Sequence, residues 1–216
     1  MSVHFAERTG KTLDAGLLKR WEKVPVAVAV DMDPGVAIDP AIRPLRPAGL
    51  QPRLFGRALV ARVTPPDFGA VLHAVAMIEP GDVLVIDAGG ETSHAMIGGI
   101  LGEHIHRIGA AGIVCDGAVR DVAELAALDD FSVFSRSINP LGPTGATTGE
   151  VGEPVTIGGR RIASGDLILG DDDGLAALSP DDMARLIGKA EGKLALEEDW
   201  LERLRNGDAI PSVFDL

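Results

Sequence analysis

The sequence predicts a single α/β domain with a long helix at its C-terminal end. The first observation is composition, because 216 residues with 46% hydrophobic and 24% charged side chains are typical of one folded domain. The second is a strand–helix–strand pattern in residues 82–115, which is the repeating unit of α/β folds. The third is an apolar stripe at helical spacing after Ser179, a residue type that commonly caps helices.

Charge and apolar stretches exclude several classes of protein. A formal net charge of -12 argues against a nucleic-acid-binding surface, which needs clustered lysine and arginine. The longest apolar stretch, residues 24–30, is too short to span a membrane, and residues 1–11 lack the apolar segment of a secretory signal. The single cysteine, Cys115, cannot form an internal disulfide, and its apolar neighbours favour a packed, unreactive thiol. We therefore expect a cytoplasmic protein with neither membrane nor nucleic acid as partner.

The chain before residue 82 shows a series of short elements. The spacing of apolar residues and the positions of proline and glycine predict each of them. In order, we expect a helix at 13–21, a strand at 24–30, a turn-rich connection at 31–39, a loop with four prolines at 40–52, a strand at 59–63 and a helix at 70–77.

The clearest unit is a crossover between two strands. An apolar run at 82–87 predicts a buried strand, and residues 112–115 predict the next one. Between them, Gly89-Gly90 indicates a tight turn and residues 95–108 a helix. Because the helix carries the chain back across the sheet, the two strands should be parallel.

The start of this helix carries further signals. Gly98, Gly99 and Gly102 each cost about 1 kcal/mol relative to alanine inside a helix, so either the helix begins later or a ligand or backbone approaches them. The loop at 89–94 leads into the helix, whose first N–H groups can hold an anion. This loop does not fit the nucleotide motifs G-x-G-x-x-G and G-x-x-x-x-G-K-[ST], so we expect no nucleotide cofactor. His94 could contact a substrate carboxylate or transfer a proton, and a polar surface histidine is the alternative.

Residues 122–216 show short elements followed by one long helix. In order, we expect a helix at 122–128, a strand at 131–134, a loop at 139–143, a hairpin at 150–162 and two strands at 167–169 and 175–178. The last two strands are joined by Asp171-Asp172-Asp173-Gly174, which is typical of a hairpin turn rather than of a metal site. Ser179, Pro180 and Asp182 form a capping-box pattern for the long helix, which we expect to pack on a neighbouring subunit or along its own core.

An Arg-Asp pair follows the second strand of the crossover. Arg120 and Asp121 close the apolar run, and the C-terminal ends of parallel strands are where open α/β sheets bind ligands. Arg120 has a planar guanidinium group that can bind a carboxylate with two hydrogen bonds. Asp121 supplies a hard oxygen ligand suited to Mg2+ or Mn2+. The pair predicts a site for a divalent metal and a small anionic acid, with a surface ion pair as the alternative.

A longer pattern around this pair resembles a known family. Gly99, twenty residues, Arg120-Asp121, two residues and Glu124 resemble the G-x20-R-D-x2-E/D signature of the class II pyruvate aldolases related to the regulator of ribonuclease activity A, the RraA-like family. The resemblance covers roughly residues 40–207. Further segments in that family's order lie at 80–87, 116–121, 142–143, 149–151, 165–168 and 172–174.

The resemblance implies a fold and an assembly. The expected fold is the swivelling β/β/α fold, similar to phosphohistidine domains, as a single domain with a long C-terminal helix. We expect a divergent N-terminal segment at 1–40, an RraA-like α/β core at 41–178, and a C-terminal helix and tail at 179–216 that packs on a neighbouring subunit. The family implies a homotrimer or homohexamer with active sites at subunit interfaces.

The resemblance also implies an activity. Catalytic members of the family are metal-dependent lyases that cleave a 4-hydroxy-2-oxo acid, such as 4-hydroxy-4-methyl-2-oxoglutarate, and release pyruvate. Oxaloacetate decarboxylation is expected as a side reaction, because both reactions pass through the pyruvate enolate. The expected cofactor is a divalent metal, Mg2+ or Mn2+. The alternative is a non-catalytic, regulator-type binding protein; such relatives tend to lack the aspartate of the pair, so Asp121 favours the enzyme.

Site residues follow from the resemblance by position. Arg120 would bind the carboxylate or keto oxygen of the pyruvyl group, and Asp121 would hold the metal. Glu124 would orient the ligands around the metal or the arginine side chain. Backbone amides complete the substrate pocket in the family, and by position they belong to Gly98, Gly99, Ile100 and Leu101.

Two features of the family's site have no certain counterpart in this chain. Many members carry an acidic residue at the position of Gly99, so a carboxylate is missing here. Catalytic members borrow a glutamate from the C-terminal helix of a neighbouring subunit, for which Glu197 or Glu198 is the candidate by position. The alternative for both glutamates is a solvated helix face.

Overall fold

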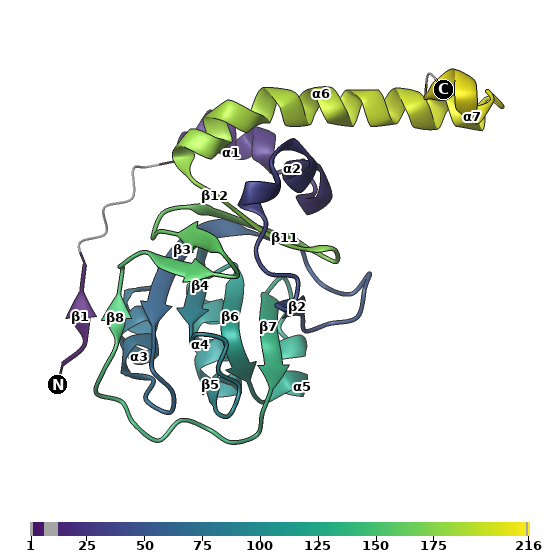
Figure 1. Cartoon of the computed structure of the whole chain (residues 1–216). Coiled ribbons are helices and arrows are strands. Elements are labelled where there is room, and N and C mark those ends of the chain that lie inside the picture. The colour runs from purple at the N-terminus through teal and green to yellow at the C-terminus, as the bar shows by residue number, and fades with distance from the viewer. Residues whose placement is uncertain (1, 7–12, 215) are drawn as a thin grey trace.

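Parallel strands form the centre of the fold (Figure 1). The computed structural model describes residues 2–6, 13–214 and 216. The central strands, in their order across the sheet, are β3 (Leu54–Arg62), β4 (Asp82–Asp87), β6 (Gly112–Val119) and β7 (Ser132–Ile138). Every residue of β4 and β6 is buried, because both faces of the parallel sheet are covered. This explains the continuous apolar runs in the sequence.

Shorter strands extend this sheet. They are β1 (His4–Phe5), β2 (Arg43–Pro44), β5 (Ala95–Ile97), β8 (Glu150–Val151), β11 (Leu167–Asp171) and β12 (Gly174–Leu178). The outer edge of β3 carries β8 at one end and β11 at the other, both antiparallel to it. Strands β1 and β12 pair with β8 and β11, and β2 pairs with β7. Strand β5 runs parallel to the last residues of β6, which is where the candidate site lies.

Different elements cover the two faces of the sheet. Helices α3 (Gly69–Met77), α4 (Gly99–Ile108) and α5 (Val122–Ala126) lie on one face (Figure 1). Their buried apolar residues share one core with alternate residues of β3, β4 and β6. The hairpin β9 (Val155–Ile157) and β10 (Arg160–Ile162) shares a second core with the opposite set of strand residues. The arrangement is therefore a β/β/α sandwich, as expected.

A third core joins the beginning and the end of the chain. Helices α1 (Ala15–Trp21), α2 (Val26–Met32) and α6 (Pro180–Arg205) share apolar contacts with β11 and β12, and the 3-10 helix η1 (Pro34–Val36) follows α2. Trp21 is fully buried there, and its Nε1 donates a hydrogen bond to the carbonyl oxygen of Met183 at 3.2 Å. The buried residues of α6 all lie in its first half, between Met183 and Ala190. Its second half projects from the body and ends near α7 (Ile210–Val213) (Figure 1).

The strand predicted at 24–30 is wrong, because this segment forms α2. A short apolar run has no periodicity that separates a strand from a buried helix. Here Val26, Val28 and Ala29 are buried in the core that α2 shares with α6 and β12. The N–H of Val26 donates to Asp171 Oδ2 at 2.8 Å, which satisfies one of the amides that a helix start leaves free.

The helix predicted at 95–108 begins later than its apolar pattern indicated. Residues Ala95–Ile97 form β5, and α4 begins at Gly99. Three predicted strands are longer than their apolar runs: β3 begins at Leu54, β6 continues to Val119 and β7 continues to Ile138. The extra residues pair with neighbouring strands, and local sequence patterns do not show which distant strand will lie alongside.

Elements that were predicted from characteristic turn and helix-cap residues are confirmed. The parallel crossover from β4 to β6 is present, and the hairpin of β11 and β12 forms. The hairpin predicted at 150–162 forms only over residues 155–162, because Glu150 and Val151 pair with β1 and β3 instead. Asp171 Oδ1 accepts from the N–H of Asp173 at 3.0 Å, so this aspartate builds the turn. Burial of Cys115 raises the pKa of its thiol, as expected for an unreactive cysteine. Among the described residues, no helix is long and apolar enough to cross a membrane.

Replacing the cap of α6 should destabilise the third core. Ser179 Oγ accepts from the N–H of Asp182 at 3.1 Å, so Ser179→Ala is expected to lower the free energy of unfolding by about 1 kcal/mol. Urea denaturation followed by circular dichroism measures this change. Ser137→Ala is the control, because the hydroxyl of Ser137 makes one long contact of 3.5 Å. An equal loss in both variants would contradict the capping role.

Candidate functional site

The C-terminal end of β6 presents a cation and a carboxylate side by side. Asp121 has φ 56° and ψ 44°, a left-handed conformation that aspartate tolerates better than most residues. It turns the chain sharply from β6 into α5. Arg120 Nε lies 3.6 Å from Asp121 Oδ2, and the two side chains are 41% and 38% exposed. Both groups therefore remain accessible to a ligand.

Strand β5 brings the start of α4 to this pair. The N–H of Arg120 donates to the carbonyl oxygen of Ile97 at 3.1 Å, and the N–H of Gly99 donates to Asp121 Oδ2 at 3.1 Å. The positive end of α4 consequently faces the Asp121 carboxylate. The N–H groups of Ile100 and Leu101 also lie in the first turn, where a helix has no acceptors of its own. They are available to an anion.

Glycines permit this close approach. A Cβ on Gly98 would lie 2.5 Å from Asp121 Oδ2 and 2.8 Å from Arg120 Cγ. A Cβ on Gly99 would overlap the Glu124 carboxylate, and one on Gly142 would overlap the Arg120 guanidinium. Of the two explanations offered for the glycines in the helical pattern, the later helix start holds, because α4 begins at Gly99. The groups that press against Gly98, Gly99 and Gly102 are side chains, not a ligand or backbone.

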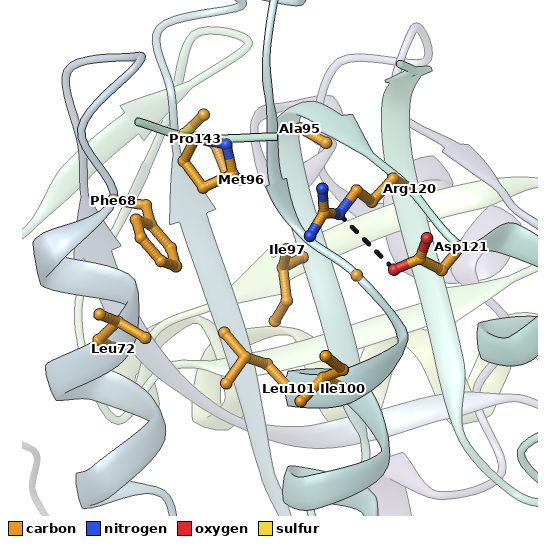
Figure 2. Close-up of a pocket in the computed structure, with 11 residues that line it drawn as sticks. Phe68, Leu72, Ala95, Met96, Ile97, Ile100, Leu101, Arg120, Asp121 and Pro143 are labelled. Carbon is orange, nitrogen blue, oxygen red and sulfur yellow. Dashed lines mark ion pairs between the residues drawn. The ribbon is translucent and has the colours of Figure 1, made fainter. Parts of the chain in front are cut away.

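A cavity of about 270 Å³ opens in front of the pair (Figure 2). Its polar side consists of Arg120, Asp121 and the backbone of Gly98. The other lining residues are apolar: Phe68, Leu72, Ala95, Met96, Ile97, Ile100, Leu101 and Pro143. Phe68 precedes α3 and Leu72 lies within it. The connection from β3 to β4 and the connection from β4 to β6 therefore both line the cavity.

The structure brings most of the predicted site residues together. Arg120, Asp121, Gly98, Ile100 and Leu101 line the cavity. Gly99 lies just behind it and contributes its amide to Asp121, while Glu124 lies against Gly99 without lining the cavity.

Three predicted residues lie elsewhere. His94 does not line the cavity, and its Nδ1 lies 2.9 Å from Ser93 Oγ. Glu197 and Glu198 lie on the projecting half of α6, at the opposite end of the molecule from β5 (Figure 1). Glu197 is 3.3 Å from Lys193 of the same helix. Within one chain these glutamates are not part of the site.

Sequence analysis missed the wall formed by α3 and the loop after β7. Phe68, Leu72 and Pro143 belong to it, and no motif marks them. The apolar spacing at 70–77 predicted a helix that covers the sheet. This spacing could not show that one side of the first turn of α3 faces a cavity, because the position of the cavity depends on where β5 ends.

The acidic residues of the site could hold a hard metal ion only together with other ligands. Among the described residues, both contacts of the Asp121 carboxylate fall on Oδ2, and none is made to Oδ1. In the part of the chain that the structure describes, no hydrogen bond or ion pair holds the Glu124 side chain, and no three His, Cys, Asp or Glu residues cluster as a complete metal site. Mg2+ fits such a donor set, since it commonly uses one or two carboxylates and retains water.

Asp67 fixes the apolar wall. It accepts hydrogen bonds from the N–H groups of Gly69, Thr147 and Thr148 at 2.9 to 3.0 Å, and from Thr147 Oγ1 at 3.0 Å. Partial burial raises the pKa of Asp67, but these hydrogen bonds outweigh it and lower the pKa to about 2. The carboxylate thus ties the start of α3 to the loop that carries Pro143.

Comparison with known proteins places the chain in a family. A family model described as RraA-like, Aldolase/RraA, matches residues 26–176. The chain belongs to the RraA-like family. A relative from Halalkalibacterium halodurans, named "Putative 4-hydroxy-4-methyl-2-oxoglutarate aldolase", is 34% identical over 154 residues, which cover 71% of this chain and 73% of the relative. A relative of the same name from Burkholderia multivorans is 39% identical over 131 residues, covering 61% of this chain and 79% of the relative.

Solved structures share the fold. An uncharacterized protein from Pseudomonas syringae has a TM-score of 0.83 at 21% identity, covering 94% of this chain and 98% of that one. The RNA-processing inhibitor RraA from Thermus thermophilus has a TM-score of 0.64 at 29% identity, covering 72% of this chain and 93% of that one. The expected RraA-like β/β/α fold is therefore confirmed.

Removing the Asp67 carboxylate should destabilise the protein in a pH-dependent manner. Asp67→Ala leaves partly buried N–H groups without an acceptor and should cost on the order of 1 kcal/mol at pH 7. Because the folded pKa of Asp67 is lowered to about 2, its contribution is present above the unfolded pKa and is lost as the pH falls from about 4 to 2. Urea denaturation at pH 7, 5 and 3 should show the difference from the unmodified protein shrinking at pH 3. Asp129→Ala, an exposed aspartate, is the control, and a pH-independent difference would contradict the assignment.

Proposed function

We propose that the protein is a divalent-metal-dependent lyase that cleaves a 4-hydroxy-2-oxo acid and releases pyruvate. The observation that carries the proposal is the meeting of Arg120, Asp121 and the first turn of α4 on one side of a small cavity. The names of relatives that are 34% and 39% identical support this reaction class.

Binding of the 2-oxo acid would rest on the cation and the helix start. The Arg120 guanidinium can hold the carboxylate, or the carboxylate and keto oxygens, with two parallel hydrogen bonds. The free N–H groups of Ile100 and Leu101 add donors whose direction is fixed by the helix. A donor set held by the backbone loses little conformational entropy when the substrate binds.

A divalent cation fits the acidic side of the same cavity. Asp121 would hold it through its open oxygen, and Glu124 would orient water around it or steer Arg120. When bound there, the cation would supply Lewis-acid polarisation of the substrate's keto oxygen. The preference between Mg2+ and Mn2+ depends on affinities, since both accept oxygen ligands.

The proposed reaction is a retro-aldol cleavage. The 4-hydroxyl group loses its proton and becomes a carbonyl as the bond between C3 and C4 breaks. The electron pair passes to C3 and spreads onto the C2 oxygen, where the Arg120 guanidinium stabilises the negative charge. C3 then takes up a proton to give pyruvate. Among the described residues that line the cavity, only Arg120 and Asp121 are ionisable, so water in the cavity would accept and return the proton. Decarboxylation of oxaloacetate passes through the same enolate.

The proposal includes a homo-oligomer, either a trimer or a hexamer. The projecting half of α6 carries Leu196 and Leu201, which are 44% and 52% exposed, and Ile100 at the cavity is 81% exposed. Packing of this half on a neighbour would cover these side chains. It would also carry Glu197 or Glu198 toward a neighbouring cavity.

A non-catalytic, regulator-type role is the second candidate. It is supported by the likeness to the RNA-processing inhibitor RraA, which is 29% identical over the aligned region. A binding protein has no need of an accessible Arg-Asp pair in a cavity, so the geometry favours the lyase.

Removal of the proposed metal ligand should abolish pyruvate release. Asp121→Ala is expected to lower kcat/KM by about 100-fold or more, because the cation that Asp121 would hold no longer polarises the keto oxygen. The measurement is Mg2+-dependent pyruvate release from 4-hydroxy-4-methyl-2-oxoglutarate and from oxaloacetate, coupled to lactate dehydrogenase. EDTA should have the same effect as the substitution.

Two matched controls separate this effect from general damage. Asp129→Ala removes an exposed carboxylate outside the cavity and should retain full activity. Arg120→Lys should raise KM more than it lowers kcat, since lysine keeps the charge and loses the planar fork. Undiminished turnover in Asp121→Ala would overturn the metal assignment. No pyruvate from any 4-hydroxy-2-oxo acid would favour the regulator-type role.

A further inference from the structure

The cavity has one charged side and one apolar side. Arg120 and Asp121 stand on the charged side, and Figure 2 shows Phe68 and Leu72 across the cavity from them, with Leu101 between. In the described part of the chain, Arg120 is the single cationic side chain that lines the cavity. A substrate with one carboxylate is therefore fully matched by this chain's own residues.

A second carboxylate would meet an unfavourable environment. Held by Arg120 at one end, a dicarboxylate would place its other end toward Phe68, Leu72 and Leu101, where no described lining residue supplies a cation to pair with it. His94 was expected as a partner for such a group, but it does not line the cavity and contacts Ser93 Oγ.

The apolar side is held in place by the protein itself. Phe68 and Leu101 pack against the core between the sheet and its helices. The N–H of Phe68 donates to the carbonyl oxygen of Gly145 at 2.9 Å, and the neighbouring Asp67 carboxylate holds the same loop. The wall is thus preformed, which favours binding of an apolar group over rearrangement to admit a charged one.

We propose that the substrates are 4-hydroxy-2-oxo monocarboxylic acids whose C4 carries an alkyl or aryl group rather than a second carboxylate. This inference rests on the proposed lyase function, and it names the substrate class of that same site. Phe68, Leu72 and Leu101 are the residues that determine the specificity, by contact with the C4 substituent. The cavity volume of about 270 Å³ suits an acid of this size.

Binding of uncleavable 2-oxo acids tests the inference independently of turnover. Phenylpyruvate and 4-methyl-2-oxopentanoate carry apolar ends, 2-oxoglutarate carries a carboxylate, and none has the 4-hydroxyl group that cleavage requires. Calorimetry on the full-length protein with Mg2+ should show the apolar acids binding at least about tenfold more tightly, since each buried methylene contributes about fourfold. Tighter binding of 2-oxoglutarate, or no binding of any of the three, would overturn the inference.

A charge placed on the wall should reverse the preference. Leu72→Arg is expected to weaken binding of phenylpyruvate about tenfold and to strengthen binding of 2-oxoglutarate. Leu50→Arg places the same charge on a residue that is 67% exposed and outside the cavity, and should change neither. Leu101→Lys replaces Leu72→Arg if circular dichroism shows that the latter is unfolded. An unchanged preference in a folded wall variant would contradict the role of the wall.

The two proposals fail in different ways. Apolar acids that bind tightly while no 4-hydroxy-2-oxo acid releases pyruvate would support the specificity of the cavity and refute the lyase. Faster pyruvate release from 4-hydroxy-4-methyl-2-oxoglutarate than from 4-hydroxy-2-oxohexanoate would refute the inference and leave the lyase standing.

Discussion

The parallel pairing of β5 with the end of β6 determines the geometry of the whole site. This pairing places Ala95 opposite Ala118 and Ile97 opposite Val119, and it ends where the N–H of Arg120 bonds to Ile97. The chain must then begin α4 directly beside Asp121. A cation, a carboxylate and a helix start are consequently fixed by backbone hydrogen bonds rather than by long side chains, which is the arrangement that precise binding sites require.

The cavity joins two parts of the chain with different chemistry. Residues 98–121 supply the charged side, and residues around α3 supply the apolar side. Asp67 holds the second part in register with the first through the loop at 145–148. In the proposed lyase, reactivity and selectivity would therefore be carried by separate elements, so that one could change in evolution without disturbing the other.

Sequence reasoning succeeded where a signal is local. The parallel crossover, the two hairpin turns and the cap at Ser179 follow from turn residues and apolar spacing, although Glu150 and Val151 lie outside the hairpin expected there. The Arg120-Asp121 pair was found because it ends a buried strand. The strand expected at 24–30 was wrong because α6, more than 150 residues away, buries Val26 and Val28 as a helix. The wall at Phe68 and Leu72 depends on the position of β5, which no local pattern reports. The chemical roles of Asp121, Glu124, Glu197 and Glu198 stay predictions.

The packing of Gly99 against Glu124 has an evolutionary consequence. The Glu124 carboxylate occupies the space that a side chain at position 99 would need, and even its Cβ lies 3.2 Å from that space. A larger residue at 99 is compatible with the fold only when residue 124 becomes shorter or turns away. The two positions should therefore covary among homologues, with one acidic group shared between them rather than one at each.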